Sequence, residues 1–167
     1  VHYNSSVDSV SQTGDAASIR FQDGSARDFD KVIIASHADT AFSLLASPTA
    51  LQTELLSPWS YSENHTVFHR DSSLMPAKKA LWGSWNAQRF TAGAPLSFTY
   101  YMNRLQDLKT KTDYFVTLNP HTEIKPKTVI KEMLYTHPIY TEKSMATQAR
   151  LPELNTEGNI YFCGSYF

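Results

Sequence analysis

Two short segments dominated by apolar side chains lie near opposite ends of this 167-residue chain and limit what it can fold into. These segments, Val32–Ala35 and Asn159–Cys163, are typical of strands that are covered on both faces. The sequence between them follows a different pattern, so the two segments bracket a separate body. We therefore predict one domain inserted into another, with the bracketing strands belonging to the interrupted domain.

The sequence before and just after the first bracketing segment predicts short local elements. Residues 1–34 alternate apolar and polar side chains around Asp23–Gly24, a pair that is typical of a hairpin turn. Residues 38–57 carry apolar side chains at three- and four-residue spacings, which predicts two short helices separated near Pro48. A further helix is expected over residues 142–151, following a threonine cap.

The middle of the chain returns to strand-like sequence, and Gly and Pro residues separate several of the runs. The predicted strands are 65–70, 79–85, 96–103, 113–118 and 129–136. Such a run of strands favours an antiparallel sheet, with the helices packed against it or beside it. The fold class that we predict is α+β, an antiparallel mixed sheet with a few flanking helices.

Charge and composition exclude several functions. The net charge is −1, from 15 basic and 16 acidic residues without a long run of either sign, so we expect no nucleic-acid partner. No apolar run reaches the roughly 18 residues of a transmembrane helix. The six histidines lack carboxylate partners at metal-ligand spacing, so we expect no metal. The single cysteine, Cys163, favours a reducing compartment, and we expect the cytoplasm.

Aromatic and amide side chains are concentrated in three of the predicted strands. Two readings stay open: a plain sheet core with asparagines at its rim, or a largely apolar pocket with a few fixed polar groups. Because alternate residues of a strand share a face, Tyr101 would lie beside Asn103, and Phe115 beside Thr117. The residues expected to contact a substrate are Trp82, Trp85, Asn86, Tyr101, Asn103, Phe115 and Thr117.

Several separate motifs occur in an order that resembles one family. They are Val32–Asp39, Leu74–Pro76, Trp82–Asn86, Tyr100–Gln106, Phe115–Pro120, His137–Pro138 and Phe162–Tyr166. Together they resemble the flavin-containing amine-oxidase-like oxidoreductases, within the superfamily of amine oxidases, protoporphyrinogen oxidases and phytoene desaturases. The resemblance covers nearly the whole chain.

The resemblance implies a cofactor, FAD, and a division of the chain. Residues 1–37 and 159–167 would be parts of the FAD-binding domain at both ends, and residues 38–158 the substrate-binding domain. The cofactor-binding residues implied are Val7, Ala35, Ser36, His37, Gly164 and Ser165. The family usually has an acidic residue where this chain has Ser165, which puts that contact in doubt.

The implied chemistry is hydride transfer from a small-molecule or lipid-like substrate to the flavin, which carries the difficult step. The sequence identifies no catalytic residue. It contains no GxGxxG motif and starts without methionine, so we expect an internal fragment that is inactive and does not hold FAD tightly. An exposed apolar sheet face would then favour self-association.

Two alternatives from other classes stay open. The first is a stand-alone module that binds a lipid or small molecule without catalysis. The second is a hydrolase that uses Cys163 as a nucleophile with a histidine. Against the second, Cys163 is expected within an apolar strand, where a thiol is usually inert packing.

Overall fold

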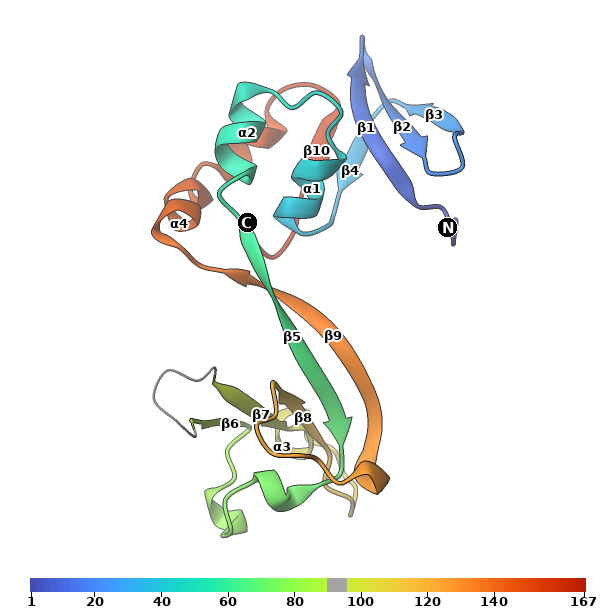
Figure 1. Ribbon diagram of the computed structural model, residues 1–167. Helices are drawn as coiled ribbons and strands as arrows, with labels where there is room; N and C mark the ends of the chain where they lie inside the picture. Colours follow the sequence, from blue (N-terminus) through green and yellow to red (C-terminus); the bar gives the residue numbers. More distant parts are fainter. Residues whose placement is uncertain (90–95) are drawn as a thin grey trace. The chain divides into compact units, whose positions relative to one another are not determined.

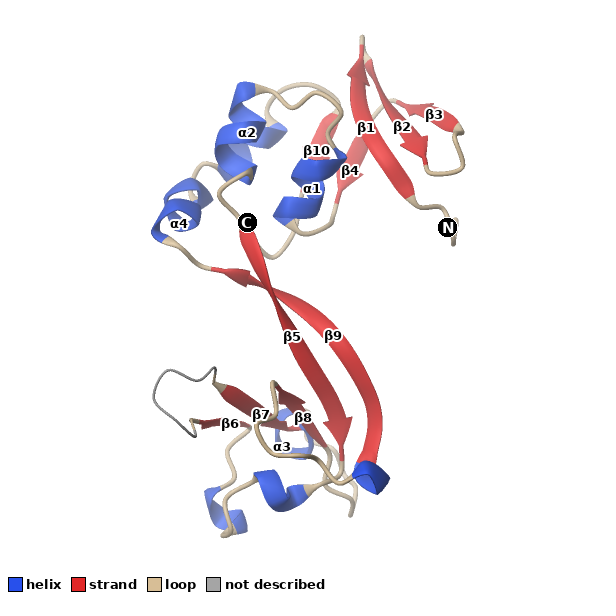
Figure 2. Cartoon of the chain, in the orientation of Figure 1, coloured by secondary structure: helices blue, strands red, loops and turns tan. Residues whose placement is uncertain are grey.

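A computed structural model describes residues 1–89 and 96–167 (Figure 1). Strands and short helices alternate along the chain (Figure 2). The elements are β1 (Val7–Thr13), β2 (Ala16–Phe21), β3 (Ala26–Phe29), β4 (Val32–Ile34), α1 (Ala38–Leu44), α2 (Ala50–Leu56), β5 (Ser60–His69), β6 (Trp85–Gln88), β7 (Ser97–Tyr101), α3 (Met102–Leu105), β8 (Phe115–Leu118), β9 (Val129–Ile139), α4 (Glu142–Gln148) and β10 (Ile160–Phe162). This is an α+β architecture with antiparallel sheets and few helices, which confirms the predicted fold class at that level.

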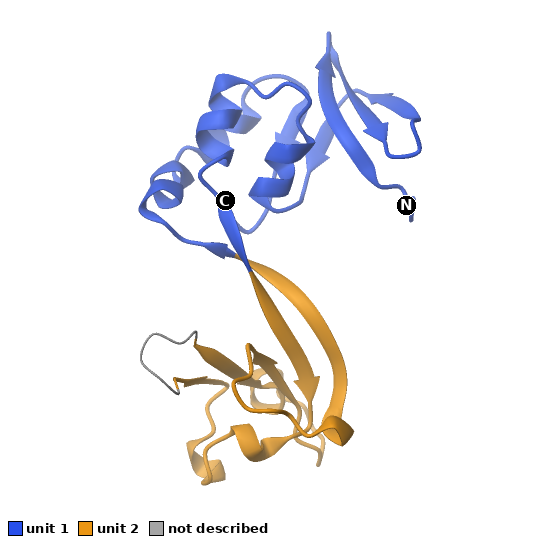
Figure 3. Ribbon diagram, in the orientation of Figure 1, with its two compact units in different colours: residues 1–62, 138–167 blue, residues 63–137 orange. Residues whose placement is uncertain are grey.

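The chain divides into two compact units (Figure 3). Unit 1 comprises residues 1–62 and 138–167, and unit 2 comprises residues 63–137. These limits differ from the predicted boundaries after residues 37 and 158. The helices around 38–57 and 142–148, expected against or beside the sheet of unit 2, pack on one another and on strands of unit 1. Within residues 1–89 and 96–167, no helix has the length and apolar character needed to cross a membrane.

The two bracketing segments are neighbours in unit 1. β4 and β10 pair in parallel, with Val32 opposite Ile160 and Ile34 opposite Phe162. All four of these side chains are buried. Ile33, between them, is 67% exposed, so the prediction that this strand is covered on both faces is wrong for this chain. Side chains alternate across a strand, and the packed elements of unit 1 bury the face of Val32 and Ile34 while leaving the face of Ile33 open.

The N-terminal residues form a separate three-stranded meander in unit 1, in the order β1-β2-β3, with antiparallel pairs. The hairpin predicted at Asp23–Gly24 is confirmed. Gly24 has a φ of 84°, a left-handed value that glycine adopts without a steric penalty. The side chain of Asp23 accepts the backbone N–H of Ser25 at 2.9 Å, which closes the turn between β2 and β3.

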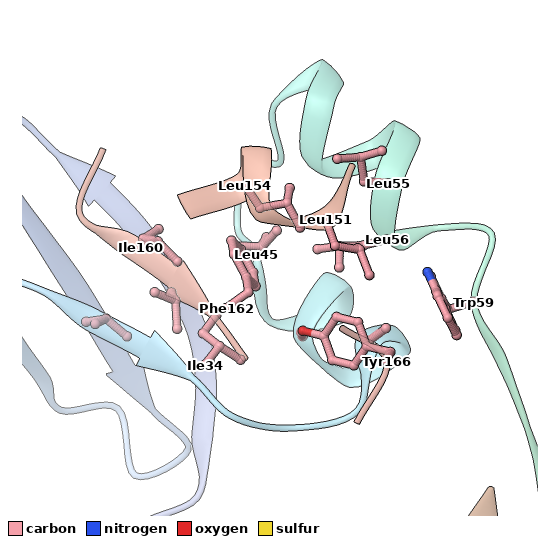
Figure 4. Close-up of a cluster of buried hydrophobic side chains, with 14 of the residues drawn as sticks. Ile34, Leu45, Leu55, Leu56, Trp59, Leu151, Leu154, Ile160, Phe162 and Tyr166 are labelled. Carbon is pink, nitrogen blue, oxygen red and sulfur yellow. The ribbon is translucent and has the colours of Figure 1, made fainter. Parts of the chain in front are cut away.

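Capping side chains begin two of the helices of unit 1, and the sequence predicts the second of these caps, Thr141. The hydroxyl of Thr49 accepts the backbone N–H of Gln52 at 3.1 Å and begins α2, and Thr141 accepts that of Ser144 and begins α4. The helices bury leucines against β4 and β10 in one core (Figure 4). Members of this core include Ile34, Leu55, Leu56, Trp59, Leu151, Phe162 and Tyr166.

Unit 2 is built on a sheet with the strand order β6-β7-β8-β5-β9. The pairs β6–β7, β7–β8 and β8–β5 are antiparallel, which confirms the predicted strand direction. The strand predicted over 79–85 is wrong, because Lys79–Leu81 form a 3-10 turn and β6 begins only at Trp85. A tertiary bond holds this turn, in which the indole Nε1 of Trp82 donates to the carbonyl of Pro76 at 2.7 Å.

The strand predicted over 96–103 ends earlier, at Tyr101. Tyr101 and Asn103 therefore do not share a strand face. Asn103 lies in the single turn of α3. Its amide nitrogen donates to the carbonyl of Thr112 at 2.7 Å, and its amide oxygen accepts the backbone N–H of Tyr114 at 2.8 Å. These two bonds close the loop after α3 and hold Asn103 outside β7.

Candidate functional site

The carboxyl ends of β4 and β10 form the first candidate site. Because the two strands are parallel, the residues that follow them lie at the same edge of the pair. The pairing continues one residue further, where the N–H of Cys163 donates to the carbonyl of Ile34 at 3.1 Å. Five of the predicted cofactor residues lie at or just beyond this edge: Ala35, Ser36, His37, Gly164 and Ser165.

Gly164 packs so closely against the ring of Tyr166 that only glycine fits, and it also lies near the chain segment after β4. A Cβ atom at this position would lie 3.2 Å from the carbonyl oxygen of Ser36 and 2.6 Å from a ring carbon of Tyr166. Contact below 3 Å with a ring would force a shift of the packed Tyr166, which is fully buried. The absence of a side chain leaves room for the Tyr166 ring and for the carbonyl of Ser36, and Gly164 and Ser165 are both exposed residues at the edge.

An aromatic residue that the sequence did not single out also lies at this edge. The Tyr61 ring stacks on His37, with ring centroids 4.3 Å apart and planes 11° from parallel. Its hydroxyl accepts the backbone N–H of Ala38 at 2.9 Å and so satisfies the first turn of α1. Burial raises the pKa of Tyr61 above its ordinary value. No sequence pattern indicates this contact, because Tyr61 comes from the start of β5.

Val7 lies in another sheet. It belongs to β1, where it pairs with Phe21 and packs half-buried against the core of unit 1. The structure therefore groups five of the six predicted cofactor residues and leaves Val7 in the meander. Cys163, which was expected inside an apolar strand, instead follows the end of β10 and is exposed. The expectation of a buried thiol is wrong, because side chains alternate along this strand and Cys163 falls on the open face with Tyr161, opposite the buried Ile160 and Phe162.

The sheet of unit 2 has two faces of opposite character, and the first is polar and buried. Thr117 lies between Thr99 and Val67 on neighbouring strands. Its hydroxyl is 2.8 Å from Nε2 of His69 and 2.9 Å from the hydroxyl of Thr99. The Nδ1 atom of His69 accepts the backbone N–H of Asp71, so Nε2 carries the proton of the neutral ring and donates to Thr117.

The protonation of His69 follows from its burial. The side chain is fully enclosed, and burial lowers the pKa of His69 to about 4, against a smaller opposing effect of Asp71. Asp71 is itself buried and accepts backbone N–H groups from Ser73 and Lys125, which hold its pKa well below its ordinary value despite the cost of burial. His69 is thus a neutral structural histidine.

An aromatic cluster lies at the end of the same face. Trp82, Tyr101 and Phe115 have ring centroids 5.2 to 5.6 Å apart. The Tyr101 hydroxyl donates to Asp113 at 2.6 Å, and the Lys79 ammonium lies within 2.9 Å of both oxygens of that carboxylate. A hollow of about 430 Å³ opens beside this cluster and is lined by Lys79, Trp82, Tyr101, Asn103 and Arg104, among others.

Among the residues predicted for the substrate, the structure brings only some together. Trp82, Tyr101 and Asn103 line the hollow. Phe115 and Thr117 are fully buried behind it. Asn86 lies on the same sheet face and bonds the backbone of Gly83 and Thr99, and Trp85 lies on the opposite face.

The opposite face of the sheet is apolar and open. Its side chains form two rows across the strands, one of Trp85, Tyr100, Val116 and Phe68, and one of Ala87, Phe98, Leu118 and Thr66. None of the eight is charged, and only Thr66 is buried. Trp85 is 66% exposed and meets Tyr100 edge to face at 5.1 Å. We call these two rows the aromatic face. Of these eight residues, only Trp85 is among those predicted from the sequence to contact a substrate.

The fold and these sites define a class of protein. A parallel pair of strands with a glycine at its carboxyl edge is joined to an inserted antiparallel sheet, and ligands of open α/β sheets bind outside such carboxyl edges. Residues 1–110 match the family described as "Flavin containing amine oxidoreductase". The chain belongs to this family.

A structural comparison agrees in fold. The chain resembles the crystal structure of a CLA-producing fatty acid isomerase from P. acnes, with a TM-score of 0.57 and 8% sequence identity. The match covers 97% of this chain and 42% of that one, so the chain spans less than half the length of this relative. No curated protein sequence matches the chain.

Proposed function

We propose that this chain is part of an FAD-dependent oxidoreductase, in which unit 1 contributes to the FAD site and unit 2 contributes the substrate site. The observation that carries the proposal is the close approach of Gly164 to Ser36 at the carboxyl edge of β4 and β10. Dinucleotides bind at such edges because exposed backbone groups approach the phosphates without side chains in the way. FAD, when bound, accepts a hydride from the substrate.

The residues at this edge fit a dinucleotide in part. Ala35, Gly164 and Ser165 are exposed residues there, and the stacked rings of His37 and Tyr61 lie beside them. Ser165 offers a neutral hydroxyl where the family usually has a carboxylate. The sequence contains no GxGxxG loop. We therefore propose that these 167 residues alone bind FAD weakly and do not turn over substrate.

The aromatic face is the surface that we propose for the substrate. Eight uncharged positions form a broad apolar wall that excludes water, and such walls with few polar groups are usual in small-molecule sites. Of the residues predicted for the substrate, Trp85 stays in this proposal. Trp82, Tyr101 and Asn103 form the alternative wall, since they line the hollow beside Lys79. Because a protein of similar fold is a fatty acid isomerase, an apolar acyl chain is a further candidate substrate.

The alternative class, a binding module without catalysis, would use the same aromatic face. Family membership favours the oxidoreductase, because a binding module has no need of a glycine at the strand edge. We place the protein in the cytoplasm, on the ground of a single cysteine that has no partner for a disulfide in this chain.

The cofactor proposal is tested by titrating FAD into the isotope-labelled chain and following its amide resonances. We expect selective shifts at Ser36, Gly164 and Ser165, with a dissociation constant above about 1 μM. The substitution Ser165→Asp restores the acidic group of the family. We expect it to tighten FAD binding several-fold, about 1 kcal/mol for one charge-assisted hydrogen bond.

Ser47→Asp is the matched control, because Ser47 is also an exposed serine of unit 1 and its substitution adds the same charge. It should leave the affinity unchanged. Shifts confined to other residues would refute the assignment of the edge, and sub-micromolar binding by the chain alone would refute the proposed weakness.

A further inference from the structure

Unit 2 contains a second hollow that no part of the proposed oxidoreductase uses. Its volume is about 550 Å³, within the range of small-molecule sites. Val67 of β5, Val129 of β9 and Ile124 of the preceding loop supply apolar lining, and these three pack in one cluster. Pro120 and Pro126 add further apolar lining. This lining suits a hydrocarbon group.

Two carboxylates, Glu123 and Glu132, line the hollow together with His65, His121 and Thr122. Glu132 of β9 accepts a hydrogen bond from Nε2 of His65 at 3.0 Å, which fixes one carboxylate oxygen. Glu123 also lines the hollow, and it has no hydrogen-bond or ion-pair partner among the residues that the structure describes. Neither lysine nor arginine lines this space among the described residues. The carboxylates therefore give the site a negative potential that disfavours anions.

The loop that closes the hollow is anchored at both ends. At one end, the N–H of Asn119 donates to the carbonyl of His65 at 2.7 Å, and the side chain of Asn119 accepts the N–H of His65 at 3.1 Å. At the other end, the N–H of Lys125 donates to the buried carboxylate of Asp71 at 3.1 Å. A ligand would thus enter a preformed space and would not have to order this loop.

We propose that this hollow binds a small organic cation, with an ammonium head at Glu123 and Glu132 and a hydrocarbon arm against the apolar lining. The site is separate from the aromatic face, because His65 and Val67 alternate along β5 with Thr66 and Phe68. The proposal does not rest on flavin binding. A metal ion is not the ligand proposed, since the described residues offer no group of three metal-binding side chains.

The test is calorimetric titration of the 167-residue chain at neutral pH with n-hexylammonium, hexanol and hexanoate, which share one arm and differ in charge. We expect hexylammonium to bind at least about tenfold more tightly than the other two. Glu132→Gln and Glu123→Gln should each weaken the binding of hexylammonium about tenfold. Glu63→Gln, an exposed change on β5, should not weaken it.

Amide resonances locate the ligand independently of the affinity. Shifts are expected at residues 121–129, and their absence on saturation would overturn the assignment of the hollow. Equal affinity for hexylammonium and hexanoate, or no loss in either glutamine variant, would overturn the assignment of charge. Glu132 and Glu123 are exposed, so both variants should fold, which thermal unfolding checks.

Discussion

Acidification should destabilise unit 2 through one residue, His69. The neutral ring donates to Thr117 and accepts from the backbone of Asp71, so a second ring proton would remove the acceptor that Asp71 N–H needs. The pKa of His69 is lowered to about 4 in the folded protein, from about 6.5 in the unfolded chain. The unfolded state therefore takes up the proton first as pH falls, and stability is lost from about pH 6.5 downward.

The size of the effect follows from these two values. Between about pH 7 and pH 5, proton uptake by the unfolded chain lowers the free energy of unfolding by about 2 kcal/mol. Asp71 contributes little in this window, because the unfolded value for its carboxyl is near 3.8 and its lowered pKa matters only below that. A loss of 2 kcal/mol should move a urea midpoint by about 1 M.

The assay is urea unfolding at both pH values, followed through the amide resonances of β7 and β8. His69→Gln removes the titrating group and keeps a donor for Thr117, so it should unfold at lower urea at neutral pH but lose the shift between pH 7 and pH 5. His65→Gln, on the exposed end of β5, is the control and should keep the shift. If His69→Gln retains the full pH shift, the argument is wrong.

Three further outcomes are expected. Leu55→Ala should cost about 3 kcal/mol in urea unfolding of unit 1, since Leu55 is fully buried in its core, and a cost below about 1 kcal/mol would contradict that packing. Trp85→Ala should reduce binding of the neutral dye Nile red several-fold, whereas Trp82→Phe should not; the reverse order would move the apolar site to the hollow of Trp82. The thiol of Cys163 should react with a maleimide in the folded chain about as fast as in urea, and strong protection would contradict its exposure.

Local chemistry explains which elements the sequence could predict. The two helices within 38–57 and the helix from 142 have apolar spacing, and two of the three have a threonine cap that the structure uses. The two strands β4 and β10 were detectable because continuous apolar runs of this length are rare outside buried strands, but their parallel pairing was not predicted. In each case the residues that determine the element lie within it.

Other features depend on contacts between distant residues, which no local pattern reports. Residues 79–81 read as strand, yet they form a turn in which Lys79 bonds Asp113 and the following Trp82 packs on Phe115, both far along the chain. Tyr61 reaches the carboxyl edge of β4 and β10 only because β5 begins beside α1. The grouping of the helices with unit 1 likewise depends on which faces meet, and the exposed Ile33 shows that a run of apolar residues does not determine how many faces are covered.

The choice between the two faces of the unit 2 sheet shows this limit most clearly. Strands β7 and β8 have large apolar side chains on both faces, so alternation predicts which residues share a face but not which face is open. The segment from Asp71 to Trp82 decides this, because it covers the face of Thr117 and brings Met75 and Trp82 against Phe115. The sheet thus buries its hydroxyls and its histidine, and leaves its most apolar face open. Burying the polar face is tolerable only because its groups bond one another, from His69 through Thr117 to Thr99. The exposed side chains of the aromatic face, Trp85 above all, have no such compensation in water, and this is the physical reason to test that face for a ligand.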